Sequence, residues 1–425
     1  MQTNAGAAGF NVSGAGVTDK LFHLSSSLRL VSPQQTLSVA KPVAIANGIT
    51  RVTEVTRLDR LGIPVFVSIR PDAIEGSLCV NAGKGLASIE AEVGATMEAL
   101  EYAFAEYNRS HLDLLTVPAA EVLDGWTGEY SVHDLCPIHG MAIEPDTAME
   151  CVMAEEMACA ARVLVPAELV FLPFRSKRHC ANWFGSSSNG LCSGNSILEA
   201  TVHGIAELIE RDIRSFESFQ SSLTLVRPSS IPEPLYDIWK AAASAGVHFL
   251  VGFVRNAYGI PYFTAILIEN EWTAPLAIHA GYGCHPDKHI ALTRAMCEAA
   301  QSRLSFIHGG RDDLSSAYNQ NLITQWQDVN SNVSSLIAEA RRSNWDIDFA
   351  TIPDQAGEIT SLQSMSNYLL STLDRIGVNK VYRVVLMPVD APISVVRVIV
   401  PRLEFFHEDN MRIGPRLRAF LYDLT

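Results

Sequence analysis

Three separated stretches of the chain place acidic side chains, alone or beside arginines, at the three- and four-residue spacing of one helix face. These sets are Glu98 and Glu101; Glu207, Glu210 and Arg211; and Arg294, Glu298, Gln301 and Arg303. Carboxylates three residues apart lie side by side on a helix and repel each other unless a partner neutralises them. Mg²⁺ is such a partner, since proteins hold it with carboxylates together with substrate phosphates. The pattern predicts helices arranged around a nucleotide site.

A glycine-rich segment precedes each of the three predicted helices, which span residues 89–107, 197–218 and 289–307. The segments are 81–85 (with Lys84 between two glycines), 185–195 and 281–286. We interpret them as loops, because backbone N–H groups at the entry to a helix bind phosphate. The pattern GxxxxGK[ST] is absent, so the site is not a Walker A loop. The three loops and helices are expected to converge on one cleft.

Ordinary surface features would explain part of this pattern. Paired acids on a helix are common at solvated surfaces, and Lys84 suits an exposed turn equally well. Arg294 and Glu298 match an i,i+4 structural pair worth ~0.2–0.5 kcal/mol. Glu207 and Glu210 favour a functional role more strongly, because the long Gly/Ser/Asn segment leads directly into their helix.

Composition excludes several classes of function. The net charge of −14 argues against general binding to nucleic acid or to anionic membranes. The one dense basic run, 175–179, is interpreted as a solvated loop. No apolar run approaches the ~18 residues that span a bilayer, and the N-terminus lacks the features of a signal peptide. HExxH and GxSxG are absent as well, which disfavours zinc-protease and serine-hydrolase chemistry.

Cysteine usage indicates the compartment. The eight cysteines show no CxxC pair and no zinc-like spacing with histidine. We therefore expect a reducing, cytoplasmic environment. Cys192 lies in the second glycine-rich segment, but no histidine or asparagine partner for a catalytic thiol is evident.

The remaining pattern predicts one α+β domain with mixed β-sheets. Residues 1–40 are interpreted as a polar N-terminal tail or extension, and residues 41–425 as the domain. Alternation of β-formers predicts strands at 63–69, 78–80, 249–254, 262–268, 276–279, 381–387 and 394–401. The polar stretch 309–345 is expected to hold surface helices.

These blocks, taken in order, resemble the YcaO family of ATP-dependent enzymes that modify peptide backbone amides. The resemblance is carried by Asn81–Gly85 with Ala95–Glu101, by Ser188–Asn195 with Glu199 and Glu207–Arg211, and by Gly281–Asp287 with Arg294–Arg303. Gly48–Arg51 and Leu58–Pro64 also match family sequence, so the resemblance covers residues 45–415. It implies the family fold, an α+β domain around an ATP and Mg²⁺ cleft.

The resemblance assigns roles to particular residues but gives no catalytic residue. It implies that four carboxylates hold Mg²⁺ on the nucleotide phosphates: Glu98, Glu101, Glu207 and Glu210. It implies that five residues contact the nucleotide: Lys84, Asn195, Glu199, Arg211 and Arg294. In the implied reaction, the amide oxygen is phosphorylated, a nucleophile adds at the former carbonyl carbon, and phosphate leaves.

Two departures from the family pattern bear on the product. Gly94 stands where relatives often carry a small hydroxyl residue. The chain ends Phe420–Thr425, where azoline-forming relatives often have a proline-rich tail, and Ser394–Pro401 is similar to relatives that work with a TfuA-type partner. This resemblance implies thioamide formation, with azoline formation from Cys, Ser or Thr as the alternative.

Partners and a second class of function stay open. The resemblance implies a precursor peptide or protein as substrate and a TfuA-like or leader-binding partner protein, with a homodimer also possible. A non-catalytic scaffold that only binds peptide or partner is the alternative of another class. Retention of both glutamate pairs argues against it, since a scaffold is free to lose them.

Overall fold

The computed structural model describes residues 21–126, 130–175, 182–220, 223–269, 278–311, 347–406 and 411–424. Within these residues the strands form four sheets, and all pairings between named strands are antiparallel. The predicted α+β class is confirmed. The predicted surface helices over 309–345 and most of the basic run 175–179 lie outside the described residues.

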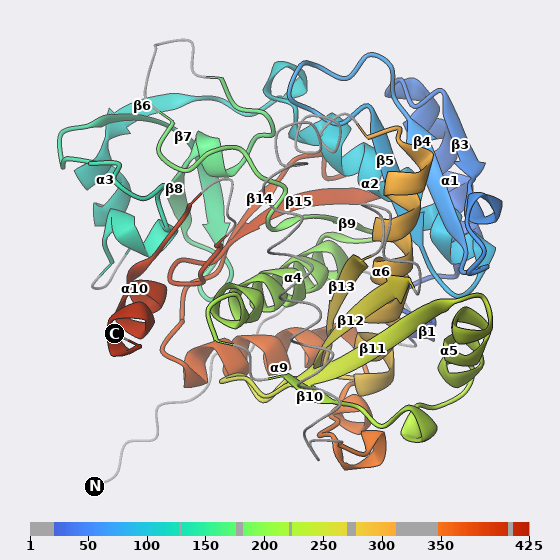
Figure 1. The fold of residues 1–425 in the computed structure, drawn as a ribbon. Helices are drawn as coiled ribbons and strands as arrows, with labels where there is room; N and C mark the ends of the chain where they lie inside the picture. The colour runs from blue at the N-terminus through green and yellow to red at the C-terminus, as the bar shows by residue number, and fades with distance from the viewer. Residues whose placement is uncertain are drawn as a thin grey trace, which may run out of the picture.

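A six-stranded sheet forms the middle of the molecule (Figure 1). Its order is β6-β7-β14-β15-β9, with β8 paired to β7. The strands are β6 (Leu115–Pro118), β7 (Ala148–Glu156), β8 (Arg162–Pro166), β9 (Leu191–Gly194), β14 (Tyr382–Val385) and β15 (Ser394–Ile399). Helix α4 (Ile197–Glu217) packs on β9 and β15, and its buried apolar residues include Ile205 and Ile209. The short helix α3 (Ala119–Asp124) lies beside β6 and β8.

Two smaller units flank this sheet, and each is an antiparallel meander whose last strand leads into a helix (Figure 1). The first contains α1 (Pro33–Ala46), β3 (Arg51–Glu54), β4 (Val65–Ile69), β5 (Val80–Lys84) and α2 (Ser88–Ala105). The second contains β10 (Leu223–Leu225), α5 (Leu235–Ser244), β11 (Val247–Val254), β12 (Tyr262–Glu269), β13 (Ile278–Cys284) and α6 (Lys288–His308). In both units the helix packs back on the strand before it.

The interpretation of the glycine-rich segments as loops is wrong for 81–84, 191–194 and 281–284, and it is confirmed for residues 185–190. Residues 80–84 and 278–284 are strands, and 191–194 form a third. A Cβ on Gly83 would clash with the backbone of Ala91 and Ala95 in α2, and one on Gly281 would clash with Ala295 and Ala299 in α6. The glycines therefore let a helix lie directly against a strand, which is a packing role rather than phosphate binding by a loop.

The predicted polar tail over 1–40 is wrong from residue 21 onwards. A short hairpin of β1 (Phe22–His23) and β2 (Leu28–Arg29) is followed by α1. Ser32 caps α1 in a capping box with Gln35, and Pro33 occupies the first helical position. Leu37, Ala40 and other residues of α1 are buried, so this segment is part of the core. The predicted boundary at residue 40 falls inside a helix.

The last described segment closes the far end of α4. Helix α9 (Leu362–Arg375) packs on α4, and α10 (Pro415–Asp423) lies near its C-terminal half. Arg416 donates to Asp212 at 2.7 Å, and the ring of Phe420 meets that of Phe216 edge-on. These contacts anchor α10 at the C-terminal half of α4.

Candidate functional site

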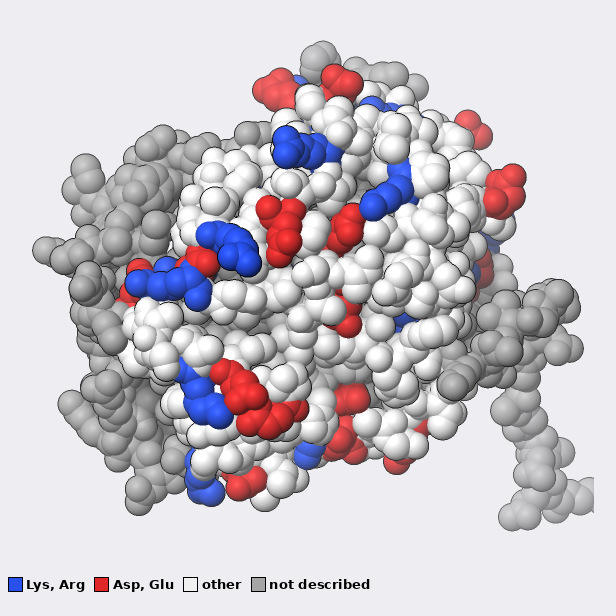
Figure 2. Space-filling view, turned by 90° about the vertical axis from the view of Figure 1, so that its right-hand side faces the viewer, with Lys and Arg blue, Asp and Glu red and all other residues white. Residues whose placement is uncertain are grey.

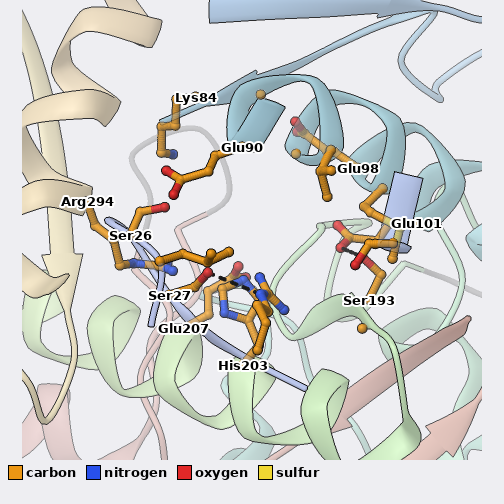
Figure 3. A pocket seen from close by; sticks show the side chains of 18 of the residues that line it. Ser26, Ser27, Lys84, Glu90, Glu98, Glu101, Ser193, His203, Glu207 and Arg294 are labelled. Carbon is orange, nitrogen blue, oxygen red and sulfur yellow. Dashed lines mark hydrogen bonds between the residues drawn. The ribbon is translucent and has the colours of Figure 1, made fainter. Parts of the chain in front are cut away.

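A pocket of about 280 Å³ lies where α2, α4 and α6 meet, and the β1–β2 hairpin contributes to its wall (Figure 3). All nine site residues predicted from the sequence line it: Lys84, Glu98, Glu101, Asn195, Glu199, Glu207, Glu210, Arg211 and Arg294. Most of them lie on α2, α4 and α6, the helices that follow β5, β9 and β13, and these strands belong to three different sheets. Lys84 ends β5, and Asn195 directly follows β9. The structure thus brings the residues together as expected, while their individual roles stay predictions.

The acid pair on α2 forms one wall of the pocket. Glu98 accepts a hydrogen bond from the Ala82 amide at 3.2 Å, and Glu101 accepts one from the Ser193 hydroxyl at 2.6 Å. Burial, with the charges of Glu98 and Glu207, raises the pKa of Glu101 to about 8 against the lowering effect of the hydrogen bond from Ser193. Burial also raises the pKa of Glu98. This wall disfavours two negative charges unless a cation is present.

The acid pair on α4 faces the pair on α2. Glu207 accepts from the Gly190 amide at 3.3 Å, and Glu210 accepts from the Cys284 amide at 3.0 Å. Burial raises the pKa of Glu210. Arg211 lies one turn from Glu207, with the closest N···O distance at 4.0 Å. The pocket therefore concentrates four carboxylates from two helices.

Helix α6 supplies the basic side of the pocket together with β5. Lys84 and Glu298 form an ion pair at 2.8 Å. Burial alone would raise the pKa of Glu298, but Lys84, Arg211 and Arg294 together outweigh it and the net shift of the pKa is downward. Among the described residues, the buried Nε of Arg294 has no hydrogen-bond partner. Figure 3 shows Lys84 and Arg294 on the side of the pocket opposite Glu98 and Glu101.

One residue grouped with α6 by helical spacing does not belong to the site. Arg303 makes ion pairs with Asp59 at 3.0 Å and with Glu269 at 3.2 Å, and all three side chains are largely buried. Its role is to join α6 to the segment before β4 and to the end of β12. Gln301, from the same set, does line the pocket and donates to the Ala82 carbonyl at 3.1 Å.

Sequence reasoning missed the part of the site that residues 24–36 provide. Arg29 donates to Glu199 at 3.2 Å, and the Leu30 amide donates to the same carboxylate at 2.9 Å. Thr36 donates to Asn195 at 2.9 Å. The signal that could have revealed this segment is the sequence Ser32-Pro-Gln-Gln35, a helix start that contradicts a polar tail.

Glu199 connects three parts of the pocket. Besides Arg29 and Leu30, its carboxylate accepts from the amide and the side chain of Asn195, at 3.1 and 2.9 Å. It is almost fully buried. A carboxylate satisfied by four donors is held rigidly, so Glu199 orders the entry to α4 and the β2 strand around the pocket.

The pocket suits a metal held jointly by protein and nucleotide. Among the described residues, no three His, Cys, Asp or Glu side chains gather tightly enough to hold an ion on their own. Glu98, Glu101 and Glu210, whose pKa values are raised, lie opposite the Arg294 guanidinium, whose Nε has no hydrogen-bond partner among the described residues. Mg²⁺ completes its shell with phosphate and water oxygens, and Arg and Lys bind phosphate. The residues present therefore fit a nucleotide with Mg²⁺.

Comparison with known proteins identifies the family. The family model described as YcaO cyclodehydratase, ATP- and Mg²⁺-binding, matches residues 82–404. The chain belongs to the YcaO family. The expected cofactors, ATP and Mg²⁺, are those of this family. A YcaO protein of Methanopyrus kandleri, solved with AMPPCP and Mg²⁺, has a TM-score of 0.72 at 21% identity, over 94% of this chain and 98% of that chain.

Other relatives support the same assignment. An uncharacterised protein of Methanothermobacter thermautotrophicus is 33% identical over 92% of this chain and 98% of its own length. A protein described as lying in the tfuA 3′ region of Rhizobium leguminosarum bv. trifolii is 31% identical over 92% of this chain and 91% of its own. A heterocyclase solved with substrate and cofactor gives a TM-score of 0.69 at 17% identity. The similarity covers 92% of this chain and only 54% of the heterocyclase.

None of the described helices combines the length and apolar character needed to cross a membrane. The face in Figure 2 carries separate acidic and basic side chains between broad uncharged areas, and no continuous basic patch is visible on it.

Proposed function

We propose that this chain uses Mg·ATP to phosphorylate a backbone amide oxygen of a ribosomally made peptide or a protein, and that a TfuA-type partner makes the product a thioamide. The observation that supports this most is the convergence of two carboxylate pairs with Arg294 and Lys84 in one pocket. This donor set pairs metal-binding acids with phosphate-binding cations, which is what phosphoryl transfer requires. The membership of the YcaO family supports the same reaction class.

Each wall of the pocket has a separate task in this proposal. Glu98, Glu101, Glu207 and Glu210 would hold Mg²⁺, while Arg294, Arg211 and Lys84 would bind the phosphates. Asn195 and Glu199 would order the nucleotide end of the pocket. Bound Mg·ATP supplies the phosphoryl group that converts the amide oxygen into a leaving group.

The fate of the activated amide decides between the two products. In the thioamide route, sulfide delivered by the partner adds at the activated carbon and phosphate leaves with the former amide oxygen. The 31% identical relative from a tfuA region supports this route. In the azoline route, a Cys, Ser or Thr side chain of the substrate adds instead. The family description as cyclodehydratase and the similarity to a heterocyclase support that alternative.

The proposal is tested by Mg²⁺-dependent ATP binding and turnover of the full chain, with and without the candidate TfuA-type partner. Glu207→Gln is expected to abolish turnover while the variant keeps the wild-type thermal unfolding transition. Mass spectrometry of the peptide then separates the routes, because one exchanges oxygen for sulfur and the other loses water. A fully active Glu207→Gln would remove Glu207 from the metal site. A wild type that binds no nucleotide would favour the scaffold alternative.

A further inference from the structure

Beyond the pocket, the polar face of α4 continues for another turn and meets the edge strand β13. Arg214 lies one turn after Glu210 and Arg211, and its guanidinium stacks over the ring of Tyr282 at 4.2 Å from the centroid. Tyr282 also stacks against Tyr262, with ring centroids 6.5 Å apart. Tyr282 follows Gly281 in β13, and Figure 1 shows β13 beside α4. Arg214 of α4, Tyr282 of β13 and Tyr262 of β12 thus form one stacked platform, and all three residues are described.

The plane of the Arg214 guanidinium lies over the ring of Tyr282. This stacking leaves the N–H groups at the edge of the guanidinium available to bind an acceptor. The side chain is half-buried. Within the described part of the chain, the Arg214 side chain makes no hydrogen bond or ion pair; its guanidinium stacks on Tyr282 and acts electrostatically on Glu217, one turn along α4. The described nitrogens that are buried without a partner do not include those of Arg214, so its N–H groups remain open to solvent. Stacking on the aromatic ring covers the face of the guanidinium. Its five N–H donors lie at the edge and are suited to a planar acceptor group.

The surroundings of Arg214 favour a neutral acceptor over an anion. Glu210 and Glu217 lie one turn before and one turn after it on α4. Glu217 accepts from Tyr262 at 2.9 Å and from Thr264 at 3.1 Å, and burial raises its pKa. The phosphates of a nucleotide would already have Arg211 and Arg294. A peptide carbonyl fits this acid-flanked position better than a carboxylate or a phosphate does.

The platform adjoins the acidic end of the nucleotide pocket. The amide of Cys284, two residues after Tyr282 on β13, donates to Glu210 at 3.0 Å. Glu210 and Glu298 both act electrostatically on the Tyr282 hydroxyl. A peptide held by the platform would therefore lie next to the carboxylates that are proposed to carry Mg²⁺.

We infer that Arg214 and Tyr282 form a subsite that binds the backbone carbonyls of the acceptor peptide beside the transferred phosphoryl group. The inference rests on the proposed function and adds to it a place for the substrate. Arg214 acts here as a binding residue for peptide. It takes no part in holding the nucleotide.

The test measures binding of one defined peptide, acetyl-Gly-Gly-Gly-Cys-Gly-Gly-Gly-amide, to the full chain with saturating Mg²⁺ and AMPPCP. NMR titration of the peptide gives its affinity, and calorimetry on the same protein gives the nucleotide affinity. Arg214→Lys keeps the charge and loses the planar fork, so peptide binding is expected to weaken about 5-fold or more. Nucleotide affinity is expected to stay within 2-fold.

Three further variants separate recognition from general damage. Tyr282→Leu should weaken peptide binding as Arg214→Lys does. Tyr282→Phe keeps the ring and should bind the peptide nearly as tightly as the wild type does. Lys240→Gln is the matched control, because Lys240 lies over the ring of Tyr236 at 4.6 Å on the remote helix α5. It should leave both affinities unchanged.

The outcomes distinguish this inference from the proposed function. Unchanged peptide binding in Arg214→Lys overturns the subsite, and so does a wild type that binds Mg·AMPPCP but not the peptide. In either case the proposed function survives. A wild type that binds no nucleotide overturns both.

Discussion

The meander that ends in α2 and the meander that ends in α6 are built alike, but their two helices present different side chains to the pocket. In both, glycine in the last strand lets an alanine-rich helix face lie against the strand, as with Gly83 and α2 or Gly281 and α6. From α2, however, Glu98 and Glu101 face the pocket without a basic partner on the same helix. From α6, Arg294 and Glu298 face it, and Lys84 already neutralises Glu298.

The pKa directions express the same difference. The pKa of Glu101 is raised, because burial disfavours its charge and neighbouring acids add to that effect. The pKa of Glu298 is lowered, because Lys84, Arg211 and Arg294 together outweigh burial. In the proposed function, one packing arrangement therefore serves two electrostatic purposes: the α2 wall would hold Mg²⁺, and the α6 wall with Lys84 would bind phosphate.

The largest expected effect comes from removing one acid of the α2 wall. Glu101→Gln should lower Mg·ATP turnover about 100-fold or more, equivalent to ~3 kcal/mol of lost transition-state stabilisation. The nucleotide-free variant should unfold at a higher temperature than the wild type, because a recessed carboxyl with a raised pKa is replaced by a neutral amide.

The matched control for this prediction is Glu92→Gln. Glu92 belongs to the same helix but pairs with Lys41 at 2.9 Å outside the pocket. Glu92→Gln should leave Mg·ATP turnover unchanged. Equal losses in both variants would mean that α2 tolerates no substitution, and the comparison of the two walls would fail.

The packing that both units share is tested by adding one methyl group. Gly83→Ala and Gly281→Ala should each destabilise the protein by about 1–3 kcal/mol, since the new Cβ meets helix backbone that must move. Denaturant unfolding measures the change. Gly357→Ala is the control, because nothing lies within 4 Å of a Cβ there. Little effect at Gly83 or Gly281 would show that the helices are not held tightly on these strands.

A smaller effect is expected on the α6 wall when its cation is removed. Lys84→Met should raise the pKa of Glu298, since burial is then opposed less. The KM for ATP should rise about 10-fold, or ~1.4 kcal/mol, with a smaller change in kcat. Steady-state kinetics across pH 6–9 separate the two parameters. A KM equal to that of the wild type would assign Lys84 a purely structural pairing role.

The smallest expected effect is the linkage between metal and protons. Because the pKa of Glu101 is raised to about 8, the folded protein retains a proton there at neutral pH. The nucleotide-free protein should therefore lose stability as pH rises from the ordinary carboxyl range through about 8. Mg·ATP binding should release roughly one proton near pH 7. Calorimetry in buffers of different ionisation enthalpy measures the release, and its absence would contradict an ionised Glu101 in the complex.

The sequence predicted the features of the fold that have local causes, and it missed those that depend on contacts between distant segments. Helical spacing predicted α2, α4 and α6 to within a few residues, because the period of polar and apolar side chains is a local property. The same spacing grouped Arg303 with the site, although its partners Asp59 and Glu269 come from distant segments. The sequence predicts the glycines as loop residues, because the sequence of a strand does not reveal that a helix packs closely against it.

The sequence by itself determined which helices exist, which faces of them are acidic, and the family to which their order belongs. Only the tertiary structure decided that these faces share one pocket, that residues 21–46 complete it through Arg29 and Thr36, and that Arg214 meets Tyr282. The physical reason is separation along the chain. A pocket is made by side chains hundreds of residues apart, and their distances and pKa values are fixed only when the sheets and helices that carry them pack together.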